Sequence, residues 1–499
     1  MQRFPIKKTQ EAEDTLTTEL TRIPQKEVVV VAGASGFVGR VLIPVLLERF
    51  KVIALGRNIP EKSDHPDLEW RSCNLFSLLQ AEEAIQDAQY AFYLVHSMAP
   101  SELTQAGFRD IDWILADNFA RACDRAGVEQ IIYLGGLIPS GQKLSEHLTS
   151  RYEVAQVLGA RKPTVTVLQA GLIIGEGGSS FRIMYRLVQR LPVMLCPKWT
   201  SSQTQPIAVE DVVELLDGCV GKPEFYGQWY DIGGPDRMTY IEMMRTTAGV
   251  MGLKRRIGSV PIFSLWLSLH WIQVITGASK QLVEPLIESL RHDMVAQENR
   301  LQKRLGVTGI PFVESLRRAL RAEQKQPSKR SALRLPYLKR PTKQKVCSIQ
   351  RLELNNSRSA QDIAMDYAKF LTQFLGPLLR VEIDENHCMS FCVLGLRKPL
   401  LKLQYVSNRS EPRRALYYIE GGILANMTRM EKTENKGRLE FRLSNCGTFV
   451  LAAIFDFAPR LPWSIYRLTQ APFHLWVMNS FGKYLRNRTS DTSTPALSL

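Results

Sequence analysis

The chain has few cysteines, and they show no paired framework. Its 499 residues include eight cysteines at irregular spacings, which excludes a small disulfide-stapled fold and is typical of a reducing compartment. Cys388 and Cys392 stand beside His387, but no second pair of ligands accompanies them in the sequence. We therefore expect no metal site and a cytoplasmic protein.

The first 26 residues lack the apolar core that a targeting peptide requires. Glu11, Asp14 and Glu19 also argue against a secretory or transit peptide, because both kinds of leader are poor in acids. We interpret residues 1–26 as a polar tail. A later stretch, 257–279, has no charged residue but is interrupted by serines and by Pro261. It predicts a buried or interfacial helix rather than a membrane span, with peripheral membrane contact left open.

Acidic residues are scarce in one segment near the middle of the chain. Residues 317–345 contain eleven Lys or Arg and a single acid, Glu323, and so carry most of the net charge of +15. Such a run fits a solvated linker, or a contact with an acidic partner or an anionic membrane. No nucleic-acid-binding motif accompanies it, so we expect no nucleic-acid partner. We interpret 326–345 as a basic linker between two domains.

Residues 28–39 combine a buried strand, a glycine-rich turn and the start of a helix. Four valines are followed by Gly33, Gly36 and Gly39, and then by apolar residues at helical spacing. A strand that turns through glycines into a helix directs backbone N–H groups and the positive helix end to one point. The pattern predicts a nucleotide-binding α/β unit in which a pyrophosphate lies on this turn.

Strand and helix patterns then alternate along the first part of the chain. Apolar strands are expected near 52–55, 68–73, 91–95, 131–134 and 165–168, with helices between them, which predicts a Rossmann-type, doubly wound parallel sheet over residues 27–325. Residues 346–488 predict a smaller α+β domain, an antiparallel sheet with one long C-terminal helix over about 462–485. A cavity for a lipid or quinone-like ligand could lie under that sheet. Residues 489–499 read as a tail.

These segments together resemble the atypical and extended short-chain dehydrogenase/reductase superfamily, in its NmrA-like (YbjT-like) branch. The resemblance is carried by Gly33-x-x-Gly36-x-x-Gly39 and by residues 92–98, 146–151, 170–175 and 206–208. The second domain is similar to the attached domain of that branch at 461–463 and 474–475. The resemblance implies a fold of the helix-grip type for this domain.

The resemblance also implies where a nicotinamide dinucleotide would bind. Arg57 follows the second strand, where NAD-preferring folds offer an acid, and so favours NADP over NAD, although NAD stays open. Asn74 and Leu75 are implied to meet the adenine, and 95–98 the nicotinamide ribose. The expected cofactor contacts are Gly33, Ser35, Gly36, Phe37, Val38, Gly39, Arg57, Asn74, Leu75, Val95, His96, Ser97 and Met98.

The catalytic pair typical of the superfamily is missing. None of the fifteen tyrosines has a lysine four residues later. By alignment His147 and Arg151 take the places of that pair on one helix face, and Gly135-Gly136 replaces the usual serine. His147 could exchange a proton, whereas Arg151 could only hold a ribose hydroxyl or a phosphate.

Three functions remain open on the sequence. The first is an NADP(H)-dependent oxidoreductase or isomerase acting on an apolar or weakly polar small molecule, with His147 as proton donor. The second is a non-catalytic, NADP(H)-binding redox sensor or accessory subunit, which the altered catalytic residues favour. The third is a membrane-peripheral carrier that binds a lipid or a quinone-like ligand in its second domain.

Overall fold

The computed structural model describes residues 26–60, 63–96, 104–139, 141, 144–260, 291–325, 345–355, 358–425 and 436–487. Several features predicted from the sequence lie outside these residues. They are nearly all of the polar tail, Ser97 and Met98, most of the uncharged stretch 257–279, most of the basic linker and the C-terminal tail.

A seven-stranded sheet forms the centre of the first domain, in the order β12-β7-β6-β4-β1-β2-β3. Every neighbouring pair of strands in it is parallel. The strands are β1 (Val28–Ala32), β2 (Lys51–Gly56), β3 (Leu68–Ser72), β4 (Tyr90–Tyr93), β6 (Gln130–Gly136), β7 (Thr164–Ala170) and β12 (Trp229–Ile232). Val29, Val30 and Val31 are fully buried, as strands covered on both faces require.

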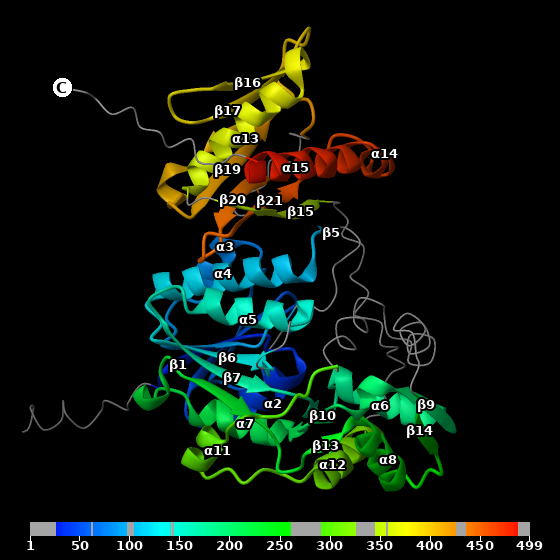
Figure 1. Cartoon of the computed structure of the whole chain (residues 1–499). Coiled ribbons are helices and arrows are strands. Elements are labelled where there is room, and N and C mark those ends of the chain that lie inside the picture. Colours follow the sequence, from blue (N-terminus) through cyan, green and yellow to red (C-terminus); the bar gives the residue numbers. More distant parts are fainter. Residues whose placement is uncertain are drawn as a thin grey trace, which may run out of the picture.

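Helices cover both faces of this sheet, so the predicted doubly wound fold is confirmed (Figure 1). On one face lie α2 (Phe37–Leu46) and α7 (Val209–Gly218), which contribute Leu42 and Val212 to the core. The other face carries α3 (Leu78–Ala84), α4 (Phe108–Ala126) and α5 (Glu146–Leu158), which contribute Ile114 and Val154.

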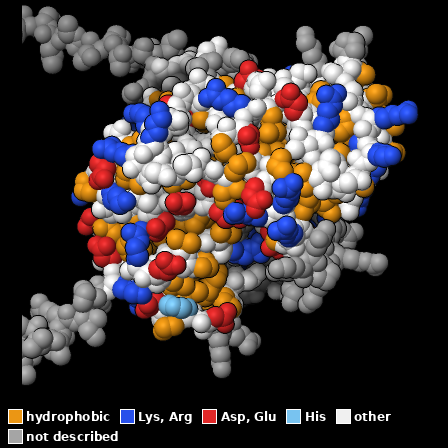
Figure 2. All heavy atoms as spheres, turned by 90° about the horizontal axis from the view of Figure 1, so that it is seen from below, with side chains coloured by type: hydrophobic (Ala, Val, Ile, Leu, Met, Phe, Trp, Pro, Cys, Tyr) orange, Lys and Arg blue, Asp and Glu red, His pale blue; other side chains and the backbone are white. Residues whose placement is uncertain are grey.

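A lobe of shorter elements follows β7 and has its own core, which includes Phe181, Tyr240 and Phe312. Its surface mixes cationic and acidic side chains (Figure 2). The remaining elements of the first domain after β7, in this lobe and beside the first sheet, are β8 (Ile173–Ile174), α6 (Ser179–Arg190), β9 (Val193–Pro197), η1 (Lys198–Ser201), β10 (Gln203–Thr204), β11 (Ile207–Ala208), η2 (Pro223–Phe225), β13 (Met238–Thr239), α8 (Tyr240–Val250), β14 (Arg256–Val260), α11 (Arg300–Leu305) and α12 (Phe312–Lys325).

The second domain is an antiparallel sheet with helices on one face, which confirms the predicted α+β class. Its strands are β15 (Val346–Glu353), β16 (Leu379–Ile383), β17 (Met389–Val393), β18 (Leu401–Tyr405), β19 (Arg414–Gly421), β20 (Arg438–Leu443) and β21 (Phe449–Phe457), with the short helices η3 (Gly376–Leu378) and η4 (Ser407–Arg409). The longer helices are α13 (Ala360–Phe374), α14 (Trp463–Leu468) and α15 (Gln470–Asn487).

The predicted long C-terminal helix is present as α15, but its first part is a separate short helix, α14. The helix is interrupted at Thr469, between α14 and α15. Pro472 explains the break, because a proline ring clashes with the carbonyl four residues earlier, here that of Leu468. Proline is tolerated in the first turn of α15, where its missing N–H would have no helical partner.

Aromatic side chains fill the space between the second sheet and its helices. Phe481 of α15 is fully buried and lies 5.1 Å from the Tyr367 ring and 5.3 Å from the Phe370 ring, measured between centroids. Tyr417 of β19 is also fully buried in this core. A lipid or quinone-like ligand in this domain therefore stays a prediction, and it would have to displace packed side chains.

The two domains share structure in a way that the sequence did not predict. The short strand β5 (Thr104–Gln105) of the first domain pairs in parallel with β15, so it adds an eighth strand to the second sheet. The outer face of that sheet packs on α4, where the Phe449 and Trp113 rings lie 6.2 Å apart. The second domain therefore rests directly on the helices that carry part of the candidate site (Figure 1).

Candidate cofactor and active site

The turn between β1 and α2 can be formed only by glycines. Gly33 has a φ of +91°, and a Cβ there would lie 2.9 Å from the Leu94 carbonyl carbon. A Cβ on Gly39 would lie 2.4 Å from the Gly33 carbonyl oxygen, and one on Gly36 would lie 2.9 Å from the same atom. These distances are shorter than real contacts, so the turn needs all three glycines to bring α2 against β1.

The N-terminus of α2 is suited to an anion. Its N-cap residue, Gly36, provides no side-chain cap, and the first turn of the helix contains no acid. The first N–H groups of a helix have no partner within the helix, and the helix dipole adds positive potential at this point. A pyrophosphate fits here because it would accept hydrogen bonds from these N–H groups.

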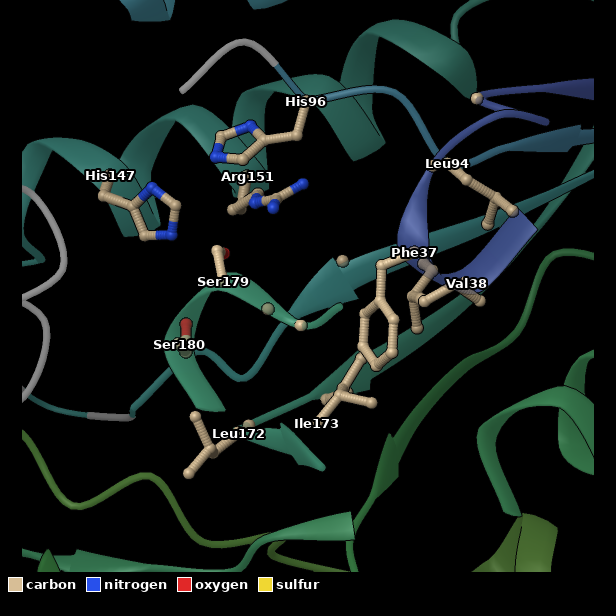
Figure 3. Close-up of a pocket in the computed structure, with 18 of the residues that line it drawn as sticks. Phe37, Val38, Leu94, His96, His147, Arg151, Leu172, Ile173, Ser179 and Ser180 are labelled. Carbon is tan, nitrogen blue, oxygen red and sulfur yellow. The ribbon is translucent and has the colours of Figure 1, made fainter. Parts of the chain in front are cut away.

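A cavity of about 340 Å³ opens at this turn, at the carboxyl edge of the first sheet (Figure 3). Phe37, Val38 and Leu94 lie at one end of it, and His96, His147 and Arg151 at the other. Ser179, Ser180, Leu172 and Ile173 form the opposite wall. The wall is largely apolar, with a few polar groups gathered at one end, which is typical of a small-molecule site.

His96 is held in a fixed orientation by α4. Its Nδ1 lies 2.8 Å from Asp112 Oδ2, and the Ser150 hydroxyl donates to the same oxygen at 3.2 Å. A carboxylate partner favours the tautomer with the proton on Nδ1, which leaves Nε2 as an acceptor. His96 Nε2 is buried and has no partner among the described residues. It could therefore accept a hydrogen bond from a ligand hydroxyl.

His147 and Arg151 lie one turn apart on α5, as the sequence predicted. The His147 ring centroid lies 5.0 Å from that of His96, and His147 Nδ1 and Arg151 Nε are buried without partners among the described residues. Burial lowers the pKa of His147 well below its ordinary value, and the charges of Arg151 and His96 add to this effect. Burial and Arg151 also lower the pKa of His96, against the opposing influence of Asp112. Both imidazoles are thus neutral at pH 7.

The end of β6 provides no hydroxyl to the cavity. Gly135 and Gly136, which the sequence places where the superfamily has a serine, line the cavity there. The phenol of Tyr133, earlier on the same strand, donates to the Arg151 carbonyl oxygen at 3.3 Å. Burial raises the pKa of Tyr133, so this phenol does not exchange protons readily. The ionisable side chains that line the cavity are the two histidines, Arg151 and Tyr240. Burial raises the pKa of Tyr240 to about 12, so this phenol stays protonated at pH 7.

The other predicted contacts lie along the same edge but do not line the cavity. Arg57 is exposed just after β2, and Asn74 is exposed after β3, where its side chain accepts from the Phe76 N–H at 3.3 Å. Ser35 is exposed at the glycine turn. Val95 packs into the hydrophobic core, and Leu94 faces the cavity instead. Leu75 also packs against the core.

Sequence reasoning missed Asp112 and Ser150, which hold His96. A signal was present for Asp112, because it is an acid between Ile111 and Trp113 on the apolar side of a predicted helix. Tyr240 and Met294 also line the cavity. No local pattern indicates these two residues, because they come from the irregular lobe.

A comparison with protein families finds a match over part of the first domain. The family described as NAD(P)H-binding matches residues 33–178, which cover the glycine turn, His96, His147 and Arg151. Residues 33–178 of the first domain are therefore an NAD(P)H-binding region.

Two curated proteins match parts of the chain. The auxiliary protein GraX of Staphylococcus aureus is 30% identical over 114 residues, which are 22% of this chain and 37% of GraX. The ceramide reductase of Caulobacter vibrioides is 26% identical over 236 residues, which are 47% of this chain and 74% of that protein.

Part of the chain can be superposed on a solved structure. The triphenylmethane reductase of a Citrobacter species in complex with NADP(H) is 16% identical, and the match covers 59% of this chain and 99% of that protein at a TM-score of 0.47.

Among the described residues, no helix is both long and apolar enough to cross a bilayer.

Proposed function

We propose that the protein is an NADP(H)-dependent oxidoreductase that interconverts an alcohol and a carbonyl group on an apolar or weakly polar small molecule. The observation that carries the proposal is the position of two neutral, partly unpartnered histidines in the cavity beside the glycine turn. The match to the ceramide reductase, a protein named for an apolar substrate, supports a reductase and a lipid-like substrate.

Different residues of the site would bind different parts of the dinucleotide. The N–H groups at the start of α2 would hold the pyrophosphate, and Arg57 would meet the 2′-phosphate that distinguishes NADP from NAD. His96 Nε2 would accept a hydrogen bond from a ribose hydroxyl, and Arg151 would donate to a ribose or phosphate oxygen. When bound, the nicotinamide would accept or supply the hydride.

The neutral state of His147 defines its role. In the direction of alcohol oxidation, an imidazole nitrogen takes the hydroxyl proton as the carbonyl forms. In the direction of carbonyl reduction, His147 must first be protonated, and its lowered pKa makes that state scarce at pH 7. We therefore expect carbonyl reduction to become faster as the pH falls from 8 to 6. Alcohol oxidation should change little over this range, because His147 stays in the neutral form that oxidation requires.

The test is NADPH oxidation with a series of long-chain ketones and aldehydes. We expect turnover that His147→Ala reduces by about 100-fold, the range that general acid–base catalysis supplies, while NADPH still binds. His387→Asn, on an exposed turn of the second domain, is the matched control and should retain full activity. Loss of activity in both variants to the same extent would refute the role of His147.

Cofactor preference gives a second measurement. Arg57→Ala should weaken NADPH binding by about tenfold, which corresponds to one charge-assisted hydrogen-bonding partner, and should leave NADH binding unchanged. Equal effects on the two cofactors would show that Arg57 does not contact the 2′-phosphate.

A non-catalytic, NADP(H)-binding sensor is the second candidate. It is favoured by Gly135 and Gly136, which leave the end of β6 without the hydroxyl that assists a reacting carbonyl. Tight NADPH binding without turnover on any of the ketones, and without effect of His147→Ala, would support the sensor over the enzyme.

A further inference from the structure

Large apolar side chains are exposed on α14 and on the first turns of α15. Leu468 is 74% exposed, and Phe473 and Trp476 are each 51% exposed. With these we group Leu461 and Ile465, which are also exposed, and we call the five residues the α14–α15 patch. Scattered exposed apolar residues are ordinary, but a contiguous group of large ones marks an interaction surface.

The patch continues onto the neighbouring elements. The Trp476 ring lies 5.7 Å from Phe473 and 4.6 Å from Phe374, at the end of α13. The chain that follows α13 reaches Leu378, whose carbonyl accepts from the Leu394 N–H at 3.4 Å. Both of these leucines are strongly exposed. The apolar surface therefore extends from α14 to the end of β17.

The charged side chains that the structure describes on α14, on α15 and just after β17 are all cationic. Residues 457–487 contain four Lys or Arg and no Asp or Glu, and Arg460 and Arg467 are exposed within the patch. Arg397 and Lys398 are exposed beyond the end of β17. The acids of this hairpin lie at 382–385, around the opposite end, because β16 and β17 run antiparallel. By contrast, the face at the other end of the molecule mixes cationic and acidic side chains (Figure 2).

We propose that the α14–α15 patch docks the protein on an anionic lipid bilayer. Trp, Phe and Leu side chains beside arginines are the combination that an interfacial membrane contact uses, since the apolar groups enter the headgroup boundary and the cations meet the phosphates. A second copy of the chain fits this surface less well, because a symmetric contact would place the arginines of both copies close together. Figure 1 places α14 on the same side of the molecule as β5 and the start of α4, which is the side of the carboxyl edge of the first sheet.

The proposal is independent of the enzymatic one and is tested without cofactor or substrate. The full chain is sedimented with vesicles of phosphatidylcholine containing phosphatidylglycerol, and with vesicles of phosphatidylcholine alone, at low and at physiological salt. We expect binding to the anionic vesicles that weakens with salt. The double variant Leu468→Ser/Phe473→Ser should lower the partition coefficient by at least about tenfold, because two large apolar side chains no longer enter the interface.

Two further variants separate the contribution of the arginines to vesicle binding from a general effect of removing exposed apolar side chains. Arg460→Gln/Arg467→Gln should weaken binding to anionic vesicles by about fivefold or more for each lost charge and leave binding to neutral vesicles unchanged. Val193→Ser/Leu195→Ser, which alters exposed apolar residues of β9 in the first domain, is the matched control and should bind as the unaltered chain does.

Each alternative has its own outcome. Absence of binding to anionic vesicles at low salt would overturn the proposal, as would equal losses in the patch variant and the β9 control. A dimer that forms at micromolar concentration and that Leu468→Ser/Phe473→Ser dissociates, without vesicle binding, would assign the patch to a second copy of the chain and overturn the proposal too.

Discussion

The cavity and the interface between the domains both contain buried polar side chains from the helices that cover the first sheet. The two regions differ in whether those side chains have hydrogen-bonding or ionic partners. At the cavity, His147 Nδ1, Arg151 Nε and His96 Nε2 have no partner among the described residues. At the interface, Asp117 of α4 accepts from Arg121 at 2.9 Å and from Arg442 of the second domain at 2.8 Å.

Glu440 is the most deeply buried acid of the interface network. It is fully buried and pairs with Arg414, Arg438 and Arg442. Burial alone would raise the pKa of its carboxyl, but the three arginines outweigh burial and hold the pKa well below its usual range. The charged groups of this region are paired with one another; Arg442 Nη2 makes no hydrogen bond among the described residues but lies 2.5 Å from a Glu440 oxygen.

The difference indicates which region awaits a ligand. A buried polar group without a partner costs free energy, and a site tolerates that cost where a bound molecule later supplies the partner. A paired network needs no such molecule and serves to fix the arrangement of the two domains. Four changes test this contrast.

The largest effect is expected at the interface. Arg442→Met leaves the buried Asp117 and Glu440 without one of their cations, and breaking a buried pair typically costs about 3–5 kcal/mol. Urea unfolding should show this loss in the free energy of unfolding. The control is Arg486→Met, because the pair of Arg486 with Glu353 is exposed and should be worth less than about 1 kcal/mol. A loss below 1 kcal/mol in Arg442→Met would show that the network does not hold the domains together.

The glycine turn should respond in ligand binding. Gly36→Asp places a Cβ within 2.9 Å of the Gly33 carbonyl oxygen and an anion where the pyrophosphate would lie. We expect NADPH binding to weaken by about 100-fold, which corresponds to about 2.7 kcal/mol. Calorimetric titration measures the change. Gly249→Asp, at an exposed position of α8 where a Cβ meets no atom within 4 Å, should bind NADPH normally. Unaltered binding in Gly36→Asp would remove the basis of the proposed function.

Arg351 of the second domain joins the interface to the site. It donates to Asp110 of α4 at 2.6 Å and to Glu153 of α5 at 3.0 Å, so it ties together the two helices that carry Asp112 and His147. Arg351→Gln should cost about 1–2 kcal/mol of stability, as expected for a partly buried charged hydrogen-bonding group, and should weaken NADPH binding several-fold. Normal NADPH binding in a destabilised variant would show that the contacts of Arg351 with Asp110 and Glu153 stabilise the fold but do not affect the cofactor site.

The smallest effect is expected in the pH dependence of stability. His147 has a lowered pKa in the folded chain, so below about pH 6.5 the unfolded chain binds a proton that the folded chain does not. Stability therefore falls as the pH falls, by up to about 1.4 kcal/mol per pH unit for this group. Denaturant unfolding of His147→Gln should show a shallower loss between pH 7 and 5.5. Identical pH profiles would mean that His147 is solvated rather than buried.

Much of the fold could be predicted from short patterns. The valine run of β1, the glycines after it and the helix that follows them could be predicted from local sequence, and the structure confirms them. The edge strand β16 was not predicted because its side chains are mostly exposed, so it lacks the apolar alternation of a covered strand. The break at Thr469 follows from Pro472, and a closer reading of local sequence could have found it.

By itself, the sequence determined the glycine turn, the individual strands of the first sheet and the spacing of His147 and Arg151 on one helix, because each depends on residues within a few positions of one another. Only the tertiary structure decided that Asp112 holds His96, that Arg442 compensates Asp117, and that β5 joins the second sheet. Those contacts join residues 16, 325 and 243 positions apart, and burial together with the register of distant strands, rather than any local pattern, brings them together.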